Sequence, residues 1–151
     1  MPTISNDTQF RQALDQLDLR EQRAVAALFV NGIAHLAREP RLREAIETAM
    51  DPDASDSQRA NAYRNAKSIA VSTYTTCGKD ADWLGQAEHF VAAACAVAMT
   101  PEDAIPERLN LAWKVAMQAR MAHNCAMIDS DQADDVTIFK QQYDILEEFL
   151  Y

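Results

Sequence analysis

The chain has 151 residues, of which 48% are hydrophobic, and its formal net charge at pH 7 is −9. This length suits one domain, so residues 1–151 are expected to form a single folded unit. Three glycines and five prolines exclude collagen-like and Pro/Gly-rich disordered chains. The first residues contain no secretory signal, and no apolar run reaches the roughly 18 residues of a membrane span. We therefore expect a cytoplasmic protein without a membrane partner.

Apolar residues at three- and four-residue spacing predict helices along the first part of the chain. A short first helix is expected over residues 10–17. The capping-box sequence Asp18–Glu21 begins a second helix, which is expected to run to about Glu39. Pro40 interrupts that helix and opens a third, which ends at Asp51.

The middle of the chain carries two further helical patterns. Ser55 and Gln58 resemble a second capping box, and the helix that they open is expected to place Cys77 on its inner face. Gly78 is the expected C-terminal cap of that helix. The next helix carries the most apolar run of the sequence and is expected to end near Met99.

The last third begins with a strong helix-start signature at Thr100 and Pro101. Pro106 is expected to restart a long helix that continues to about Met127. Asp131 is the expected cap of the last helix. The main apolar stripe of that helix comprises Val136, Phe139, Tyr143, Leu146 and Leu150, widened by Ile138, Ile145 and Phe149.

Strand signals are absent, because no Asn-Gly or Asp-Gly turn joins alternating runs and β-branched residues do not cluster. The sequence therefore predicts an all-α fold, an antiparallel bundle of five or six helices in one domain. Residues 23–40 align with residues 84–101 at several alanine, phenylalanine and proline positions. This match indicates a possible degenerate helical-hairpin repeat.

The negative charge is concentrated in the second half of the chain. Residues 1–79 are neutral overall, whereas residues 80–151 hold 13 acidic and 4 basic side chains. Such a chain would repel a phosphate backbone, which excludes direct nucleic-acid binding as the expected function. The asymmetry favours a basic protein partner attracted by long-range steering, or it serves solubility alone.

The cysteine pattern does not indicate disulfides or redox chemistry. Cys77, Cys95 and Cys125 form an odd set with no Cys-x-x-Cys spacing. Cys95 lies in the apolar run, where a free thiol behaves as a small hydrophobic side chain.

Asp82 and His89 are the first pair of candidate binding residues. Together with Gln86 they share one face of the predicted helix, so the carboxylate could orient the imidazole. A solvated polar stripe explains the same spacing. His35 is expected on a solvated polar face with Arg38.

Arg120 and His123 form the second candidate pair, because they continue a helical stripe that otherwise faces the core. A buried cation needs acceptors, which Asp82, Glu88 or the acidic last helix could supply. The pair would then line a small anion-binding or partner-docking pocket, or it would form a buried ion pair that sets helix register.

No motif indicates a metal, a cofactor or a catalytic centre. The sequence lacks the Glu-x-x-His segments of di-iron bundles, paired-cysteine zinc spacing, a nucleophile elbow and grouped glycines for a phosphate loop. We expect no cofactor and no catalytic residues, and a protein that is not an enzyme.

Three segments of the chain, in order, carry a family resemblance: EPRLREAIETAM, QAEHFVAAACAVAM and FKQQYDILEEFL. They resemble small helical immunity proteins of bacterial toxin systems, over about residues 24–150. The resemblance implies a non-catalytic protein that binds and neutralises a toxin.

The leading hypothesis is therefore an acidic helical protein-binding module for a basic partner. One alternative is a ligand- or metal-binding bundle with an internal polar pocket around Arg120 and His123. The other is a structural subunit of a homo-oligomer that packs through exposed Ile138, Phe149 and Tyr151 of the C-terminal helix.

Overall fold

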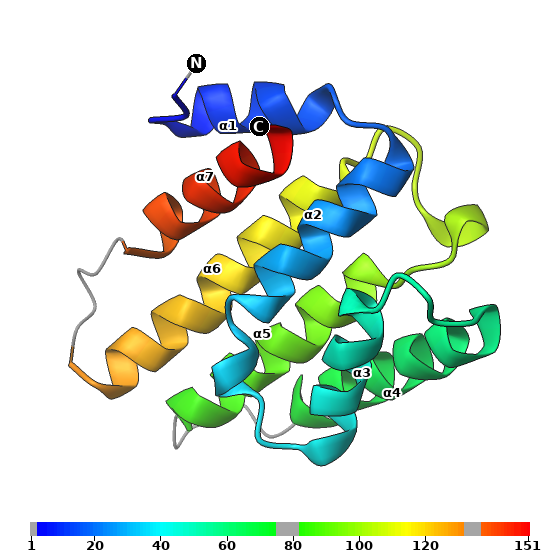
Figure 1. Ribbon diagram of the computed structural model, residues 1–151. Helices are drawn as coiled ribbons and strands as arrows, with labels where there is room; N and C mark the ends of the chain where they lie inside the picture. The colour runs from blue at the N-terminus through cyan, green and yellow to red at the C-terminus, as the bar shows by residue number, and fades with distance from the viewer. Residues whose placement is uncertain (1–2, 75–81, 132–136) are drawn as a thin grey trace.

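The computed structural model describes residues 3–74, 82–131 and 137–151, and these ranges contain seven α-helices and no strand (Figure 1). The α-helices are α1 (Asp7–Asp15), α2 (Leu19–Asn31), α3 (Pro40–Met50), α4 (Asp56–Tyr74), α5 (Trp83–Ala98), α6 (Leu111–Asp129) and α7 (Thr137–Leu150). Two one-turn 3₁₀ helices, η1 (Ala34–Leu36) and η2 (Glu102–Ala104), lie in connections. The all-α prediction is confirmed, although the helices exceed the five or six expected.

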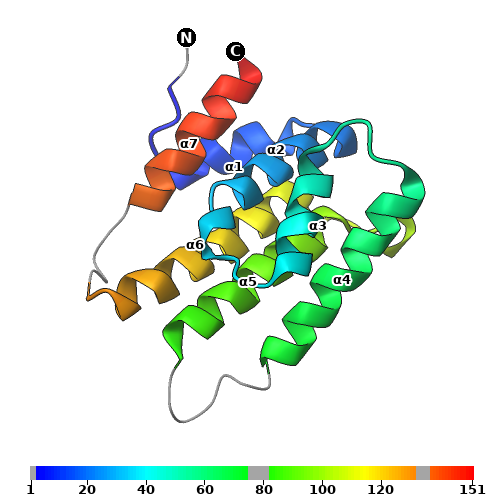
Figure 2. The same ribbon diagram turned by 60° about the horizontal axis from the view of Figure 1, so that its bottom comes forward.

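Helices α4, α5 and α6 lie side by side, with α2 and α3 packed across them (Figures 1 and 2). Helix α6 contacts α5, α2, α7 and α1, so it connects the central helices to the first and last helices of the chain. The segment before α1 lies beside α7, because the backbone N–H of Ile4 donates to the Glu147 carboxylate. No helix in the described ranges is long and apolar enough to cross a membrane.

The core is packed with small side chains in one region and with aromatic side chains in another. Small side chains fill the contacts of α5 and α6, which lets these helices approach closely. The fully buried alanines there include Ala92, Ala94, Ala112, Ala116, Ala119 and Ala122. Where α1 and α7 meet α6, the core is aromatic instead. The Phe10 ring lies 5.7 Å from Phe29, 6.1 Å from Trp113 and 5.3 Å from Tyr143 between ring centroids.

Both predicted capping boxes are confirmed. Asp18 accepts the Glu21 N–H at 2.8 Å, and Glu21 accepts the Asp18 N–H at 3.0 Å. Ser55 and Gln58 exchange the same pair of bonds at 3.1 and 2.8 Å. These contacts span three residues, so local sequence was sufficient to predict them.

The second helix is shorter than expected, because α2 ends at Asn31 and not near Glu39. A tertiary contact holds the next segment outside helical geometry. The buried carboxylate of Glu88, on α5, accepts the backbone N–H groups of Arg38 and Glu39, the latter at 2.7 Å. Pro40 then opens α3 as predicted.

The helix start expected at Thr100 and Pro101 is wrong, because only the one-turn η2 follows. The Thr100 hydroxyl donates to the Ala96 carbonyl oxygen and so belongs to the end of α5. The long helix begins at Leu111 and not at Pro106, since the Asn110 side chain caps it by accepting the Trp113 N–H at 2.9 Å. Asn110 is held by a bond to Asp15, and the Leu111 N–H donates to Gln22, so distant helices set this boundary.

The inward face of α7 comprises Ile138, Gln142 and Leu146. Ile138, expected to be exposed, is only 3% exposed, because it packs into the main core. Asp131 has a left-handed φ of 62° just beyond the end of α6, six residues before Thr137, the first residue of α7. The predictions for Cys77, Gly78 and Val136 lie outside the described residues.

Candidate functional site

Arg120 is buried on α6 and meets groups from two other helices. Its Nη1 and Nη2 groups donate to the two Asp7 oxygens, both at 2.8 Å, and its Nε donates to Gln142 Oε1 at 2.8 Å. The guanidinium carbon lies 4.1 Å from the Phe139 ring centroid. A bidentate pair with an aromatic face against it is among the strongest settings for an arginine. Arg120 therefore forms an ion pair, one of the two hypotheses for this residue, in which its own side chain is buried and that of Asp7 is part-exposed.

The carboxylate that neutralises Arg120 was not foreseen. It comes from Asp7 on α1, 113 positions away in sequence, and not from Asp82, Glu88 or an acid of the last helix. The hydrogen bond from Arg120 lowers the pKa of Asp7, against the opposing effect of partial burial. Tyr143 also donates to Asp7, at 2.8 Å, and burial followed by this bond raises the pKa of the Tyr143 phenol. Through this cluster Arg120 joins α6 to α1 and α7.

Gln142 completes the cluster and was also missed. It is only 1% exposed, accepts from Arg120 and donates to the Ala116 carbonyl oxygen at 2.9 Å. A polar residue at four-residue spacing from Ile138 and Leu146 on an apolar helix face was the available signal. Asp7 offered a weaker signal, because it lies three positions before Phe10, which is buried.

Asp82 and His89 do not face each other. Asp82 is not on the helix but caps α5, accepting the Gly85 N–H at 3.0 Å. Gly85 allows this close approach, because a Cβ there would lie 2.5 Å from Asp82 Oδ2. His89 instead turns to α4, where its Nδ1 lies 2.8 Å from the Ala70 carbonyl oxygen and 3.0 Å from Thr73 Oγ1. The shared polar face expected for these two residues is therefore wrong.

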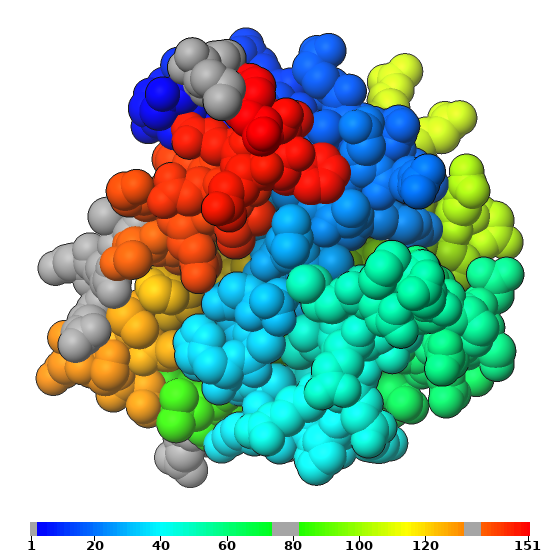
Figure 3. Space-filling view, viewed as in Figure 1, coloured from blue at the N-terminus to red at the C-terminus, as the bar shows by residue number. Residues whose placement is uncertain are grey.

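His123 lines a shallow hollow beside α7, which we call the α7 groove. It has a volume of about 440 Å³ and lies among α7, the end of α6 and the corner between α2 and η1, which Figure 3 shows packed together. Its lining residues are Gly32, His35, His123, Met127, Thr137, Ile138, Lys140, Gln141, Asp144, Ile145 and Glu148. His35 and His123, which the sequence did not predict to lie together, therefore both line the α7 groove.

Potential metal ligands and thiol groups are two further features of the described residues. No group of three or more histidine, cysteine, aspartate or glutamate side chains in those ranges could hold a metal ion. Cys95 and Cys125 are buried, and burial raises the pKa of the Cys95 thiol to about 12. That thiol stays protonated and inert at neutral pH.

The carboxylates of residues 80–151, the acidic half of the chain, lie in separate parts of the fold. Glu88 is buried and holds the start of α3. A first exposed group, Glu102, Asp103 and Glu107, lies in the connection between α5 and α6. A second exposed group, Asp129, Asp131, Asp144 and Glu148, lies at the end of α6 and along α7.

Two members of the second group occupy positions that do not favour helix stability. Asp129 lies in the last turn of α6 and Glu148 in the last turn of α7, and neither turn contains a basic residue. Negative charge at a helix C-terminus opposes the helix dipole. Lys140 pairs with Asp144 at 3.1 Å, whereas none of the described cations lies within 4.0 Å of Glu148. The end of the α7 groove therefore carries an uncompensated carboxylate.

Comparison of the chain with family models, curated proteins and solved structures finds no match.

Proposed function

We propose that this all-helical chain, one domain built as an antiparallel bundle, is a non-catalytic binding protein for a basic protein partner. Its binding surface is the α7 groove together with the carboxylates around it. The single observation that carries the proposal is Glu148, an exposed carboxylate at the edge of a groove and at the unfavourable end of a helix. A cation from a partner would supply what this position lacks.

The lining of the groove suits a lysine or arginine side chain. The apolar part of the groove, from Met127 and Ile145, would pack against the aliphatic stem. The charged head would then reach Glu148 and the last carbonyl groups of α7, where the helix dipole favours a cation.

The resemblance to immunity proteins makes a toxin the partner class that we propose. An inhibitor of this kind needs no catalytic group, because it acts by covering a surface. If the gene beside this one encodes a basic toxin, co-expression of the two should protect host cells, and Glu148→Lys should reduce that protection.

A defined probe tests the surface directly. We would titrate the isotope-labelled protein with a decalysine peptide and follow backbone amide chemical shifts. Saturable shifts should concentrate in α7, the end of α6 and η1, and they should weaken as salt rises. Shifts that concentrate in residues 102–107, or that spread evenly over the surface, would contradict the proposal.

Two charge-reversal variants provide a matched comparison. Glu148→Lys should weaken peptide binding roughly tenfold, since it converts an attraction into a repulsion at the groove. Asp103→Lys makes the same change of net charge in the other acidic group and should weaken binding much less. Equal loss in both variants would mean that net charge alone, and not the α7 groove, attracts the peptide.

A further inference from the structure

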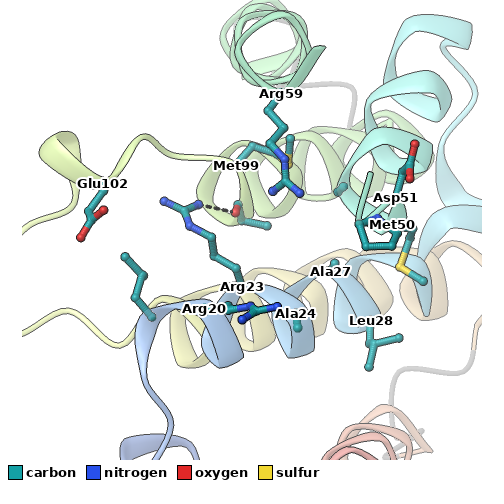
Figure 4. A pocket seen from close by; sticks show the side chains of 14 residues that line it. Arg20, Arg23, Ala24, Ala27, Leu28, Met50, Asp51, Arg59, Met99 and Glu102 are labelled. Atoms are coloured by element: carbon teal, nitrogen blue, oxygen red, sulfur yellow. Dashed lines mark hydrogen bonds between the residues drawn. The ribbon is translucent and has the colours of Figure 1, made fainter. Parts of the chain in front are cut away.

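A second hollow, which we call the arginine cleft, lies on a different part of the molecule. It has a volume of about 710 Å³ and opens among the first turns of α2, the end of α3, the start of α4 and the end of α5 (Figure 4). Its lining residues are Leu19, Arg20, Arg23, Ala24, Ala27, Leu28, Ala49, Met50, Asp51, Pro52, Arg59, Ala98, Met99 and Glu102. Small and apolar side chains form most of this wall, and its charged residues are Arg20, Arg23, Asp51, Arg59 and Glu102.

Three of the lining residues are arginines from two helices. Figure 4 shows Arg59 reaching from α4 toward the Arg23 side chain, which rises from α2, while Arg20 lies one turn earlier on α2. Within the described residues, no carboxylate oxygen lies within 4.0 Å of any of the three guanidinium groups. This cluster of positive charge is unusual in a chain with a net charge of −9.

The three arginines differ in how many hydrogen bonds they donate within the protein. Arg23 Nη1 donates to the Ala98 carbonyl oxygen at 2.9 Å, and Nη2 donates to that of Thr100, which holds its guanidinium at the end of α5. Arg59 makes one long bond to the Ala54 carbonyl oxygen, at 3.4 Å. Arg20 is exposed. Two of the three cations therefore retain most of their donor groups.

The arrangement costs the folded protein energy. Burial and then repulsion from Arg59 lower the pKa of Arg23, while Glu102 opposes both effects from beyond ion-pair distance. Three arginines and two carboxylates, Asp51 and Glu102, line the hollow, and neither carboxylate lies within ion-pair distance of these arginines. Such an excess of like charge around a hollow is typical of a site prepared for an anion.

We propose that the arginine cleft binds a small organic molecule through a doubly charged oxyanion group, with a phosphate monoester as the type case. The planar guanidinium group of Arg59 would donate paired hydrogen bonds to its oxygens. Arg23 would donate from the N–H groups that the Ala98 and Thr100 carbonyl oxygens leave open, and Arg20 would add charge from the rim. The volume exceeds that of the anion alone, so the organic part would lie against Leu28, Met50 and Met99.

This inference is independent of the proposed function. No residue of α7 lines the arginine cleft, and none of its three arginines lines the α7 groove. Loss of binding at one surface would leave the other unaffected, so the two proposals fail separately.

Thermal unfolding with defined anions tests the cleft. Sodium phosphate and hexyl phosphate should raise the melting temperature in a saturable way, relative to sodium chloride of matched ionic strength. Hexyl phosphate should bind more tightly than phosphate, because its tail meets the apolar wall. Hexyl sulfate, with the same tail and a single charge, should bind more weakly than hexyl phosphate. Equal shifts for all four salts, or equal affinity for the two hexyl esters, would overturn the proposal.

Two variants distinguish an effect on ligand binding from an effect on the stability of the fold. Arg59→Gln should weaken hexyl phosphate binding by roughly tenfold, the loss expected for a charged hydrogen-bonding partner. Without ligand its melting temperature should equal or exceed that of the wild type, since repulsion of Arg23 is relieved. Arg64→Gln, on the exposed face of α4 beside Asn61, is the matched control and should bind as the wild type does. Unchanged affinity in Arg59→Gln, or the same loss in both variants, would overturn the assignment.

Discussion

The protein holds two arginines in two different ways. Arg120, between α1, α6 and α7, has a carboxylate, an amide and an aromatic face around its guanidinium. Arg23, between α2 and α5, has two backbone carbonyl groups and a second arginine nearby. The first site is complete within the chain, whereas the second keeps an excess of positive charge.

This difference separates a structural role from a binding role. A buried charge with a matched partner holds helices together and offers little to a ligand. A cluster of like charges weakens the fold and gains from an anion supplied from outside. Substitutions at the two sites should therefore change stability by different amounts, and loss of Arg59 at the second site should change it with the opposite sign.

The largest effect is expected from Asp7→Asn, which keeps the shape of the side chain and leaves Arg120 buried without a counter-charge. The Asp7 side chain is 43% exposed and that of Arg120 only 8%. Solvent at Asp7 screens part of the loss, so we expect destabilisation of about 2–3 kcal/mol. Urea unfolding measures it, with Asp53→Asn in an exposed loop as the control. Destabilisation no larger than in the control would show that the pair contributes nothing.

A smaller effect is expected from Gln142→Leu. The change leaves Arg120 Nε without its acceptor in the core, which should cost about 1–2 kcal/mol. Gln141→Leu, at the exposed neighbouring position on α7, should change stability by less than about 0.5 kcal/mol. Equal effects of the two substitutions in urea unfolding would mean that the Arg120 cluster does not depend on the amide.

The Asp7–Arg120 pair also predicts a pH dependence. The pKa of Asp7 is lower in the folded chain than its ordinary value of 3.8. Its contribution is therefore fully present above that value and is lost as the pH falls through the folded-state pKa. Urea midpoints measured from neutral to acid pH should fall more steeply for the wild type than for Asp7→Asn. Parallel curves would contradict the pKa shift.

The smallest effect is expected at the arginine cleft. Arg59→Gln in phosphate-free buffer should change the free energy of unfolding by no more than about 0.5 kcal/mol, in the stabilising direction. Arg23→Gln loses the bonds to the end of α5 and should destabilise by about 1 kcal/mol. If Arg59→Gln were the more destabilising of the two, Arg59 would have a structural role that its long bond to Ala54 does not indicate.

The sequence alone was enough to predict part of the candidate sites. It selected Arg120 as a buried cation, because the residue continues an apolar stripe, and it offered the ion pair as one explanation. It placed Asp82 and His89 on one face, since helical spacing alone does not tell whether a residue caps a helix or lies on it. It passed over Arg20, Arg23 and Arg59, because charged residues on two separate helices carry no mark that they meet at one hollow.

By itself the sequence determined the all-helical fold, both capping boxes and the start of α3 at Pro40. Those features depend on contacts within one helical turn, which adjacent residues are enough to specify. Only the tertiary structure decided where α2 ends and where α6 begins, which carboxylate neutralises Arg120, and which arginines stand together. Each of these depends on groups from distant helices, such as Glu88 bonding to Glu39 or Asp7 to Arg120, and helix packing alone brings such groups together.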